Sequence, residues 1–249
     1  MRFFLPQAKI EERETFSLFG WEHILLLAAV AAALFFGLRG IAFLEHSRAE
    51  QVIRTVAICV PVLEFTHTIW LYLTGTTSII KLLPLHLCAM QSIFIPLAVF
   101  TRKRCFYEFI YATSILGGFF GILLPSGVAG CYPLWHYQTL QTALLHALLM
   151  FVPLALIRIK VFRPDIRNFP KVLLIFLSVA LAAAAVDFGF GENYMFLRQA
   201  PEGTPLVWIY DTFGHAGYLC ITFLLLAALS LSLYLPFLKR KKQKGQGNA

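Results

Sequence analysis

Seven long runs of apolar residues, each bounded by charged or turn-forming residues, follow one another along the chain. A membrane-spanning helix needs about 20 mostly apolar residues, because each residue advances the helix about 1.5 Å through a hydrocarbon layer about 30 Å thick. The pattern therefore predicts an all-α fold, a single seven-helix transmembrane domain covering residues 1–249. The predicted spans are residues 21–38, 52–73, 79–100, 106–125, 138–158, 170–190 and 208–238.

Both ends of the chain are polar and lie outside these spans. Residues 1–20 mix charged and aromatic positions and lack the apolar core and cleavage site of a secretory signal. We expect this segment to lie along the membrane surface, with Phe16, Phe19 and Trp21 at the interface. Residues 239–249 are rich in lysine and arginine, which predicts a solvated cytoplasmic tail.

The composition agrees with a membrane protein and excludes other classes. Hydrophobic residues make up 59% of the chain and charged residues only 14%, whereas soluble domains carry about 25% charged residues. The 24 Phe and 9 Tyr exclude a disordered chain, which lacks apolar surface to bury. The five cysteines form no C-x-x-C pair, so neither a disulfide framework nor a thiolate metal site is indicated.

The net charge of +8 is explained by membrane topology. Most lysines and arginines fall in the loops after the first, third and fifth predicted helices and in the C-terminal tail. The positive-inside rule then places the N-terminus outside a cell membrane and the C-terminus in the cytoplasm. This leaves no reason to expect a nucleic-acid partner, and the oligomeric state stays open.

Ionisable side chains within predicted spans are the main functional signal. Placing such a group at the middle of a membrane costs at least about 2.5–3.5 kcal/mol for Asp, Lys or Arg, so each one suggests a function. Counted along the helices, nearly all of them fall in the outer half of the bundle, while the inner half is almost purely apolar. This distribution predicts a polar cavity open to the exterior. The polar residues are His23, Glu64, His67, His86, Gln91, Gln138, Gln141, His146, Asp187, Asp211 and His215.

Two pairs have helical spacing. Glu64 and His67 are three residues apart, and Asp211 and His215 are four apart. Each pair should share a helix face, where the carboxylate can orient the imidazole.

The third helix carries the best candidate nucleophile. Pro84 is expected near its first residue, which places His86 and Cys88 in the first turns, where the positive helix end favours a thiolate. Cys88 should share a face with Gln91, whereas His86 should point in a different direction. For any single buried Cys, packing is the simpler role, and for a single His or Gln it is an interhelical hydrogen bond. The clustering of these ionisable residues in the outer half of the bundle is what favours a functional site over packing.

Three motifs resemble a known family. Leu83-Pro84-Leu85-His86-Leu87-Cys88 opens a helix, His146 lies midway along the fifth helix, and Asn193-Tyr194-Met195-Phe196-Leu197-Arg198 follows the sixth. In this order they resemble the YwaF-type bacterial membrane proteins, which are related to eukaryotic transmembrane protein 164. The resemblance covers nearly the whole chain. The eukaryotic relative is described as a phospholipid acyltransferase that uses a cysteine and a histidine, which implies acyl transfer here.

The first hypothesis is therefore a phospholipid acyltransferase or acyl hydrolase. Acyl transfer needs a nucleophile, a base and oxyanion donors. Cys88 would attack a membrane phospholipid, His146 or His86 would act as the base, and Asn193 or Gln91 would stabilise the oxyanion, with no metal or cofactor. The residues expected to bind substrate are His23, Glu64, His67, Gln91, Asp187, Asn193, Tyr194, Asp211 and His215.

Two alternatives remain open. A zinc-dependent lipid hydrolase could draw ligands from His67, His86, His146 and His215 with an aspartate, although no local H-E-x-x-H motif supports it. A non-enzymatic carrier or receptor could bind a small ligand in the same cavity. Retinal is excluded as that ligand, since the seventh helix has no lysine for a Schiff base.

Overall fold

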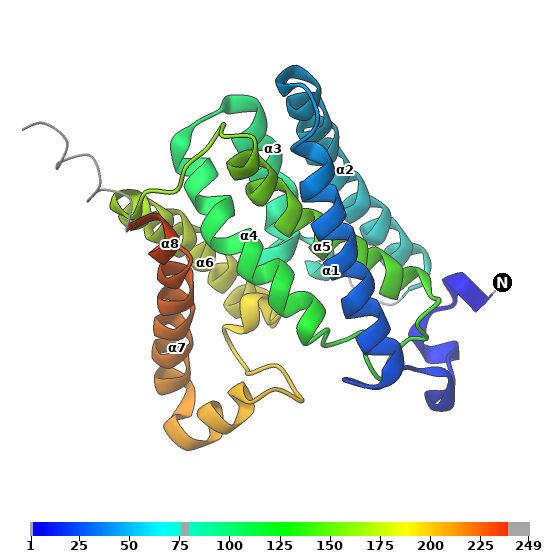
Figure 1. The fold of residues 1–249 in the computed structure, drawn as a ribbon. Helices are drawn as coiled ribbons and strands as arrows, with labels where there is room; N and C mark the ends of the chain where they lie inside the picture. Colours follow the sequence, from blue (N-terminus) through cyan, green and yellow to red (C-terminus); the bar gives the residue numbers. More distant parts are fainter. Residues whose placement is uncertain (1, 76–79, 239–249) are drawn as a thin grey trace, which may run out of the picture.

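The chain folds into a helical bundle, which confirms the all-α prediction. The structure is a computed structural model that describes residues 2–75 and 80–238, and no strand occurs among them. The described residues form seven helices of 15 residues or more, labelled in Figure 1: α1 (Trp21–Ile41), α2 (His46–Leu73), α3 (Leu87–Thr101), α4 (Arg104–Leu123), α5 (Tyr137–Arg158), α6 (Phe169–Phe190) and α7 (Leu206–Ser232). The short helices are η1 (Arg2–Phe4), η2 (Gln7–Lys9), η3 (Glu12–Glu14), η4 (Ile80–Leu82), η5 (Ile166–Asn168), η6 (Tyr194–Phe196) and α8 (Leu235–Leu238). The predicted basic tail, residues 239–249, lies outside the described residues.

Helix α3 is shorter than predicted. Among the described residues, six helices are long and apolar enough to cross a membrane, and α3 is the additional, shorter apolar helix. Its 15 residues span about 22 Å, less than the hydrocarbon thickness of about 30 Å. The helix begins at Leu87 rather than at residue 79, and Pro84 lies outside it. Pro84 disfavours the helical conformation at Leu83, the residue before it. His86, the N-cap of α3, is itself extended (φ −71°, ψ 146°).

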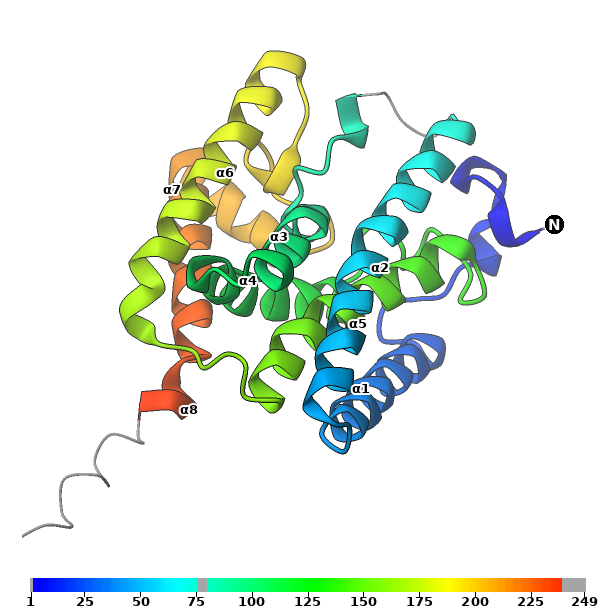
Figure 2. The same ribbon diagram turned by 90° about the horizontal axis from the view of Figure 1, so that it is seen from above.

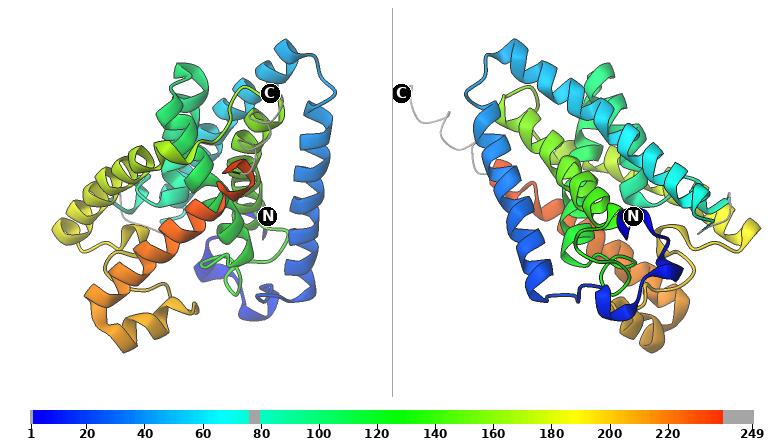
Figure 3. Two further views of the ribbon diagram at one scale, coloured as in Figure 1. Left: turned by 60° about the vertical axis from the view of Figure 1, so that its left-hand side comes forward. Right: turned by 90° about the vertical axis from the view of Figure 1, so that its right-hand side faces the viewer.

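Helices α4 and α5 form the centre of the bundle. They are the most buried of the candidate spans, whereas α1 and α7 are mostly exposed, as expected for lipid-facing helices. Helices α1 and α2 pack on α5, while α3, α6 and α7 pack on α4 (Figure 2). Figure 3 shows α1 and α7 on opposite sides of this central pair.

The N-terminal segment is tied to the bundle rather than lying free on a surface. Phe16 is 1% exposed and exchanges backbone hydrogen bonds with the loop between α4 and α5, so its predicted interfacial position is wrong. Phe19 and Trp21 are exposed, and their position at the membrane interface stays a prediction. Near the start of the segment, the Phe4 carbonyl accepts a hydrogen bond from the Trp70 indole N–H, which fixes η1 against α2.

His136 holds the same segment through its neutral form. This fully buried residue caps α5: Nδ1 accepts from the Gln138 backbone N–H at 3.1 Å, and Nε2 lies 3.0 Å from the Leu5 carbonyl oxygen. Since a carbonyl only accepts, Nε2 carries the proton and Nδ1 does not. Burial lowers the pKa of His136 below its usual 6.5, with the Leu5 hydrogen bond acting in the opposite direction.

We predict that acid loosens this anchor. With its pKa lowered in the fold, His136 binds protons more weakly than in the unfolded chain, so stability is complete above about pH 6.5 and falls below it. Thermal unfolding of the purified protein should show a lower Tm at about pH 5.5 than at about pH 7.5. His136→Gln should reduce this difference. An equal pH dependence in the variant would contradict the assignment.

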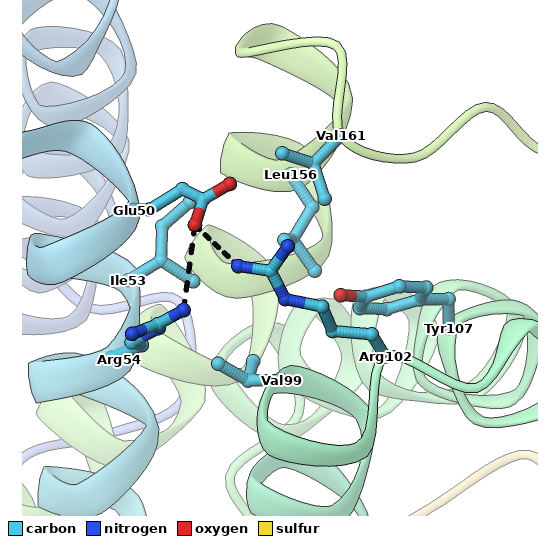
Figure 4. A pocket seen from close by; sticks show the side chains of 8 residues that line it. All are labelled: Glu50, Ile53, Arg54, Val99, Arg102, Tyr107, Leu156 and Val161. Carbon is cyan, nitrogen blue, oxygen red and sulfur yellow. Dashed lines mark hydrogen bonds and ion pairs between the residues drawn. The ribbon is translucent and has the colours of Figure 1, made fainter. Parts of the chain in front are cut away.

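Most of the loop arginines lie at one end of the bundle, where α2 begins and α3 ends. This end is here termed the basic end. Glu50 of α2 accepts a 2.6 Å hydrogen bond from Arg102 and lies 3.5 Å from Arg54 (Figure 4). Arg102 ends α3 in the left-handed conformation (φ 55°), which aims its side chain across to α2. These ion pairs connect α2 and α3 beside a small pocket of about 10 Å³ that Tyr107 and Leu156 also line.

A buried carboxylate lies at the basic end, which corrects the expectation of an almost purely apolar inner half. Glu108 of α4 is fully buried and accepts hydrogen bonds from the Asp165 backbone N–H, the Asn168 amide and the Tyr234 hydroxyl at 3.1, 3.2 and 3.0 Å. The Arg104 guanidinium lies 3.5 Å away. Glu108 thus joins α4 to the α5–α6 connection and to the end of α7.

We predict that Glu108→Ala destabilises the protein strongly, because one buried donor and two partly buried donors lose their acceptor at once. The expected cost is about 3 kcal/mol or more, measured as a lower Tm in detergent. Glu108→Gln retains one acceptor oxygen and should cost less. Equal Tm values for Glu108→Ala and the unmodified chain would show that the buried cluster contributes nothing.

Candidate functional site

A cavity of about 430 Å³ lies at the end of the bundle opposite the basic end, here termed the cavity end. Its walls come from α2, from η4 and the start of α3, and from η6 with the two residues before it. The structure thus brings together five residues that the sequence singled out. The polar residues lining the cavity are Glu64, His67, Thr68, His86, Glu192, Asn193 and Tyr194.

The α2 wall carries polar side-chain atoms that form no hydrogen bond within the described residues. Glu64 and His67 both line the cavity, which confirms that they share a face. Among the described residues the Glu64 carboxylate has no hydrogen-bond partner. The buried Nε2 of His67 forms no hydrogen bond of good geometry in that part of the chain, although the Gln138 side chain lies near enough to act on His67. Glu64 and His67 are not hydrogen bonded to each other in the described structure. The predicted hydrogen bond by which the carboxylate would orient the imidazole is therefore absent there. His67 instead stacks on Trp70, with ring centroids 6.4 Å apart.

The opposite wall is built around His86. Its Nδ1 accepts from the Met195 backbone N–H at 3.4 Å, and its ring lies 5.1 Å from Tyr194 and 5.6 Å from Phe196, measured between centroids. Asp187, at the end of α6, lies near enough for its charge to act on His86. Asp187 does not itself line the cavity.

The segment 193–196 is held in an unusual backbone conformation. Met195 and Phe196 have φ values of 51° and 58°, a left-handed region that costs non-glycine residues energy. Asn193 supports this turn by accepting from the backbone N–H groups of Arg198 and Gln199, and Asp187 Oδ1 accepts from the Tyr194 N–H at 2.7 Å. The second oxygen of Asp187 is buried without a partner among the described residues.

The polar side-chain atoms of Asn193 and Tyr194 are already hydrogen bonded to backbone groups of the protein. The Asn193 amide donates to the Gln199 carbonyl, and the Tyr194 hydroxyl donates to the Ile80 carbonyl. Burial raises the pKa of the Tyr194 phenol above its usual 10, which keeps it a donor. Their visible role is to shape the cavity and to connect η6 with η4.

Cys88 and His146 lie against α4 and not in the cavity wall. The Cys88 thiol donates to the Gly117 carbonyl at 3.6 Å, while His86 opens into the cavity, so the two diverge as predicted. The His146 ring packs on Gly121, where an added Cβ would lie 2.2 Å from Nε2. Gly117 and Gly121 are four residues apart on one face of α4. The thiol and the imidazole thus meet the same glycine face about one helical turn apart.

The tautomer of His146 follows from its hydrogen bond. Nδ1 lies 2.7 Å from the Thr142 carbonyl oxygen, one turn earlier in α5. Because that oxygen can only accept, Nδ1 carries the proton in the neutral ring and Nε2 has the lone pair. Nε2 is the nitrogen directed at the glycine face, so His146 presents a proton acceptor to the side of α4 that Cys88 also contacts.

Two other predicted site residues form hydrogen bonds between packed segments. His23 is fully buried, with Nδ1 accepting from the Phe19 N–H and Nε2 2.9 Å from the Ile122 carbonyl. Gln91 is also fully buried: its amide donates to Thr113 and its oxygen accepts from Ser114. Gln91 faces α4 as Cys88 does, which agrees with the prediction that the two share a helix face. Its amide N–H group already donates to Thr113, however, and is not free to stabilise an oxyanion.

The Asp211–His215 pair is not formed. Gly214 lies between the two residues with a non-helical conformation (φ 68°, ψ 178°), so the expected four-residue spacing does not place them on one face. His215 Nε2 instead lies 2.7 Å from the Leu197 carbonyl, and Asp211 is exposed. Glycine tolerates this conformation, and the sequence alone did not show that α7 would use it.

Sequence reasoning missed Thr68 and Glu192 in the cavity wall. Thr68 lies four residues after Glu64, so the helical period could have revealed it. Glu192 precedes the Asn193 motif directly. The zinc hypothesis needs about three ligands in one place, and no group of three His, Cys, Asp or Glu side chains suited to a metal ion occurs within the described ranges.

In a comparison with known families, the model of the TMEM164 family matches residues 18–230. This match agrees with the resemblance to transmembrane protein 164, and it is compatible with the YwaF-type bacterial group. No curated protein and no solved structure matches the chain.

We predict that Gly121→Ala displaces His146. The added Cβ would overlap the imidazole, and overpacking of this kind costs about 1–3 kcal/mol. The variant should therefore unfold at a lower temperature. Gly189→Ala in α6 is the matched control, because a Cβ there meets no atom within 4 Å. Equal Tm values for the two variants would show that the glycine face does not constrain His146.

Proposed function

Because the chain belongs to the TMEM164 family, we propose that it is an acyltransferase acting on membrane phospholipids, with Cys88 as the nucleophile and His146 as the base. The observation that carries the proposal is that this thiol and this imidazole pack against the same glycine face of α4, about one helical turn apart. The resemblance described above implies the same pair of residue types.

The chemistry needs a proton acceptor beside the thiol, because the thiolate is the reactive form. In this mechanism Nε2 of His146 takes the Cys88 proton as Sγ attacks the ester carbonyl of a phospholipid. The Sγ–C bond forms, the ester C–O bond breaks, and the proton passes from His146 to the departing lysophospholipid oxygen. The product is a thioester on Cys88, from which the acyl group is transferred to an acceptor hydroxyl. His86, the other candidate base, points into the cavity and suits substrate binding better.

The cavity suits the polar part of a lipid. Its volume of about 430 Å³ lies in the range of small-molecule sites, and its walls combine Glu64, His67 and His86 with leucine side chains. The loop arginines gather at the opposite end of the bundle, so the positive-inside rule supports a cavity that opens to the outer side of the cell membrane. A lipid in the outer leaflet would then present its ester just below the interface.

The alternative function is that of a carrier or receptor, which would bind a small ligand in the same cavity without a covalent step. The unpartnered groups of Glu64 and His67 would serve such a function equally well. Covalent labelling by a phospholipid acyl chain therefore separates the two functions.

We predict that the purified protein, mixed with phosphatidylcholine vesicles carrying an alkyne-labelled acyl chain, acquires a label that hydroxylamine releases. Cys88→Ala should abolish this label, and His146→Gln should slow its formation about 10²–10⁴-fold. Cys59→Ala is the matched control, because Cys59 is exposed on α2 and should leave labelling unchanged. Undiminished labelling in Cys88→Ala would exclude Cys88 as the nucleophile, and no label in the unmodified chain would favour the carrier function.

A further inference from the structure

Two arginines at the basic end share one acidic partner. The Arg102 guanidinium donates to Glu50 Oε2 at 2.6 Å, and the Arg54 guanidinium lies 3.5 Å from the same oxygen. The other carboxylate oxygen of Glu50 lies 3.3 Å from His46 Nε2. Within the described residues no second acidic side chain pairs with either guanidinium. A bridge between α2 and α3 needs one cation for one carboxylate, so the second arginine leaves a surplus positive charge.

Both guanidinium groups also keep N–H donors that the fold does not use. A guanidinium carries five N–H donors in a planar fork, and here one nitrogen of each arginine is directed at Glu50. The side chains of Arg54 and Arg102 are each about half exposed. Water alone can satisfy exposed donors of this kind, so a binding site needs a further, independent feature.

The Tyr107 hydroxyl supplies that feature. Tyr107 is 6% exposed, and its ring packs on Phe162 with ring centroids 5.4 Å apart. It lines the same pocket as the two arginines (Figure 4). Its hydroxyl forms no hydrogen bond in the part of the chain that the structure describes, whereas the hydroxyl of Tyr234 donates to Glu108. A buried hydroxyl without a partner is costly, which points to a ligand atom that accepts from it.

The pocket between these donors is small and partly apolar. Its volume of about 10 Å³ admits about one water-sized group. The buried side chains of Ile53, Val99 and Leu156 line it together with the donors. Near the end of α3, Leu97 and Phe100 are exposed. One oxygen atom of a larger ligand can therefore enter the pocket, while an apolar part of that ligand lies along α3.

We propose that this pocket, here termed the arginine pocket (Glu50, Arg54, Arg102 and Tyr107), binds the phosphate of an anionic phospholipid. One phosphate oxygen accepts from the two guanidinium groups and from the hydroxyl, and the acyl chains lie along α3. Hydrogen bonds from arginine to phosphate are charge-assisted and belong to the strong ones. Basic pockets between membrane helices are typical sites for anionic lipid headgroups.

The surroundings favour a lipid over a free anion. A free phosphate has no apolar part to cover Leu97 and Phe100, and it loses water against the apolar lining of the pocket. A zwitterionic lipid brings a cationic group, which the surplus positive charge repels. The positive-inside rule predicts that this end faces the cytoplasmic leaflet, which carries anionic lipids. Because the arginine pocket lies at the opposite end of the bundle from the cavity, this proposal does not depend on the proposed function.

The test measures lipid binding to the full-length protein in a non-ionic detergent. Dioleoylphosphatidylglycerol is added in mixed micelles, and native mass spectrometry of the bound lipid gives a Kd. The lipid should also raise the Tm, because it binds only the folded chain. Arg54→Gln should weaken binding about five-fold, the usual contribution of one basic residue near an anionic lipid. Dioleoylphosphatidylcholine should bind more weakly than the anionic lipid.

Two further variants separate a specific site from general attraction between charges. Tyr107→Phe keeps the ring on Phe162 and removes only the hydroxyl, so it should weaken binding about ten-fold without a change in net charge. Arg48→Gln is the matched control, because Arg48 is exposed on the same helix as Arg54 and does not line the pocket. It removes the same charge and should bind the lipid as the unmodified chain does. The lipid-free Tm of each variant shows whether weaker binding comes from a weakened fold.

Four results would overturn the proposal. Equal weakening by Arg48→Gln and Arg54→Gln would show that diffuse charge holds the lipid, and so would unchanged binding in Tyr107→Phe. An equal Kd for phosphatidylcholine would show that the pocket does not select an anionic headgroup. If inorganic phosphate at the same concentration raises the Tm as much as phosphatidylglycerol does, the ligand is a free anion and not a lipid. None of these results bears on the labelling of Cys88, so the proposed function would stand.

Discussion

The close approach of α5 to α4 is the contact on which the rest of the bundle depends. A Cβ at Gly118 would lie 2.7 Å from the His146 carbonyl oxygen, and one at Gly121 would overlap the His146 ring, so only glycine allows the two helices to pack this closely. In a membrane, lipid tails compete with side chains for apolar contact, and association relies on such tight packing of small residues. Since α1 and α2 pack on α5, and α3, α6 and α7 on α4, this contact positions every other long helix.

Two kinds of polar residue can be distinguished in the bundle, apart from Asp187, whose second oxygen is buried without a partner outside the cavity wall among the described residues. His23, Gln91, His136 and Glu108 are fully buried with hydrogen-bond partners, and they connect segments that are distant in the chain. Glu64 and His67 keep unused polar atoms next to a cavity. Of these two kinds only the second is available to a ligand, which is why the proposed function rests on the cavity and on Cys88 and His146.

Several parts of the site followed from local sequence. The three-residue spacing of Glu64 and His67 placed both on the cavity face, and the two-residue spacing of His86 and Cys88 correctly predicted that they diverge. The same reasoning failed for Asp211 and His215, because helical spacing assumes regular geometry and Gly214 interrupts it. It also failed for α3, where the apolar run continues before Leu87 but the backbone around Pro84 is not helical.

Apolar runs, turn residues and charge bias were enough to determine an all-helical membrane protein, since hydrocarbon thickness and backbone hydrogen bonding act on each segment separately. The tertiary structure decided which polar side chains are partnered and which remain open, because partners such as Ile122 for His23 and Gly117 for Cys88 lie on other helices. It also decided that Cys88 and His146 meet on one glycine face. That meeting depends on how closely two helices pack, a distance that no single segment encodes.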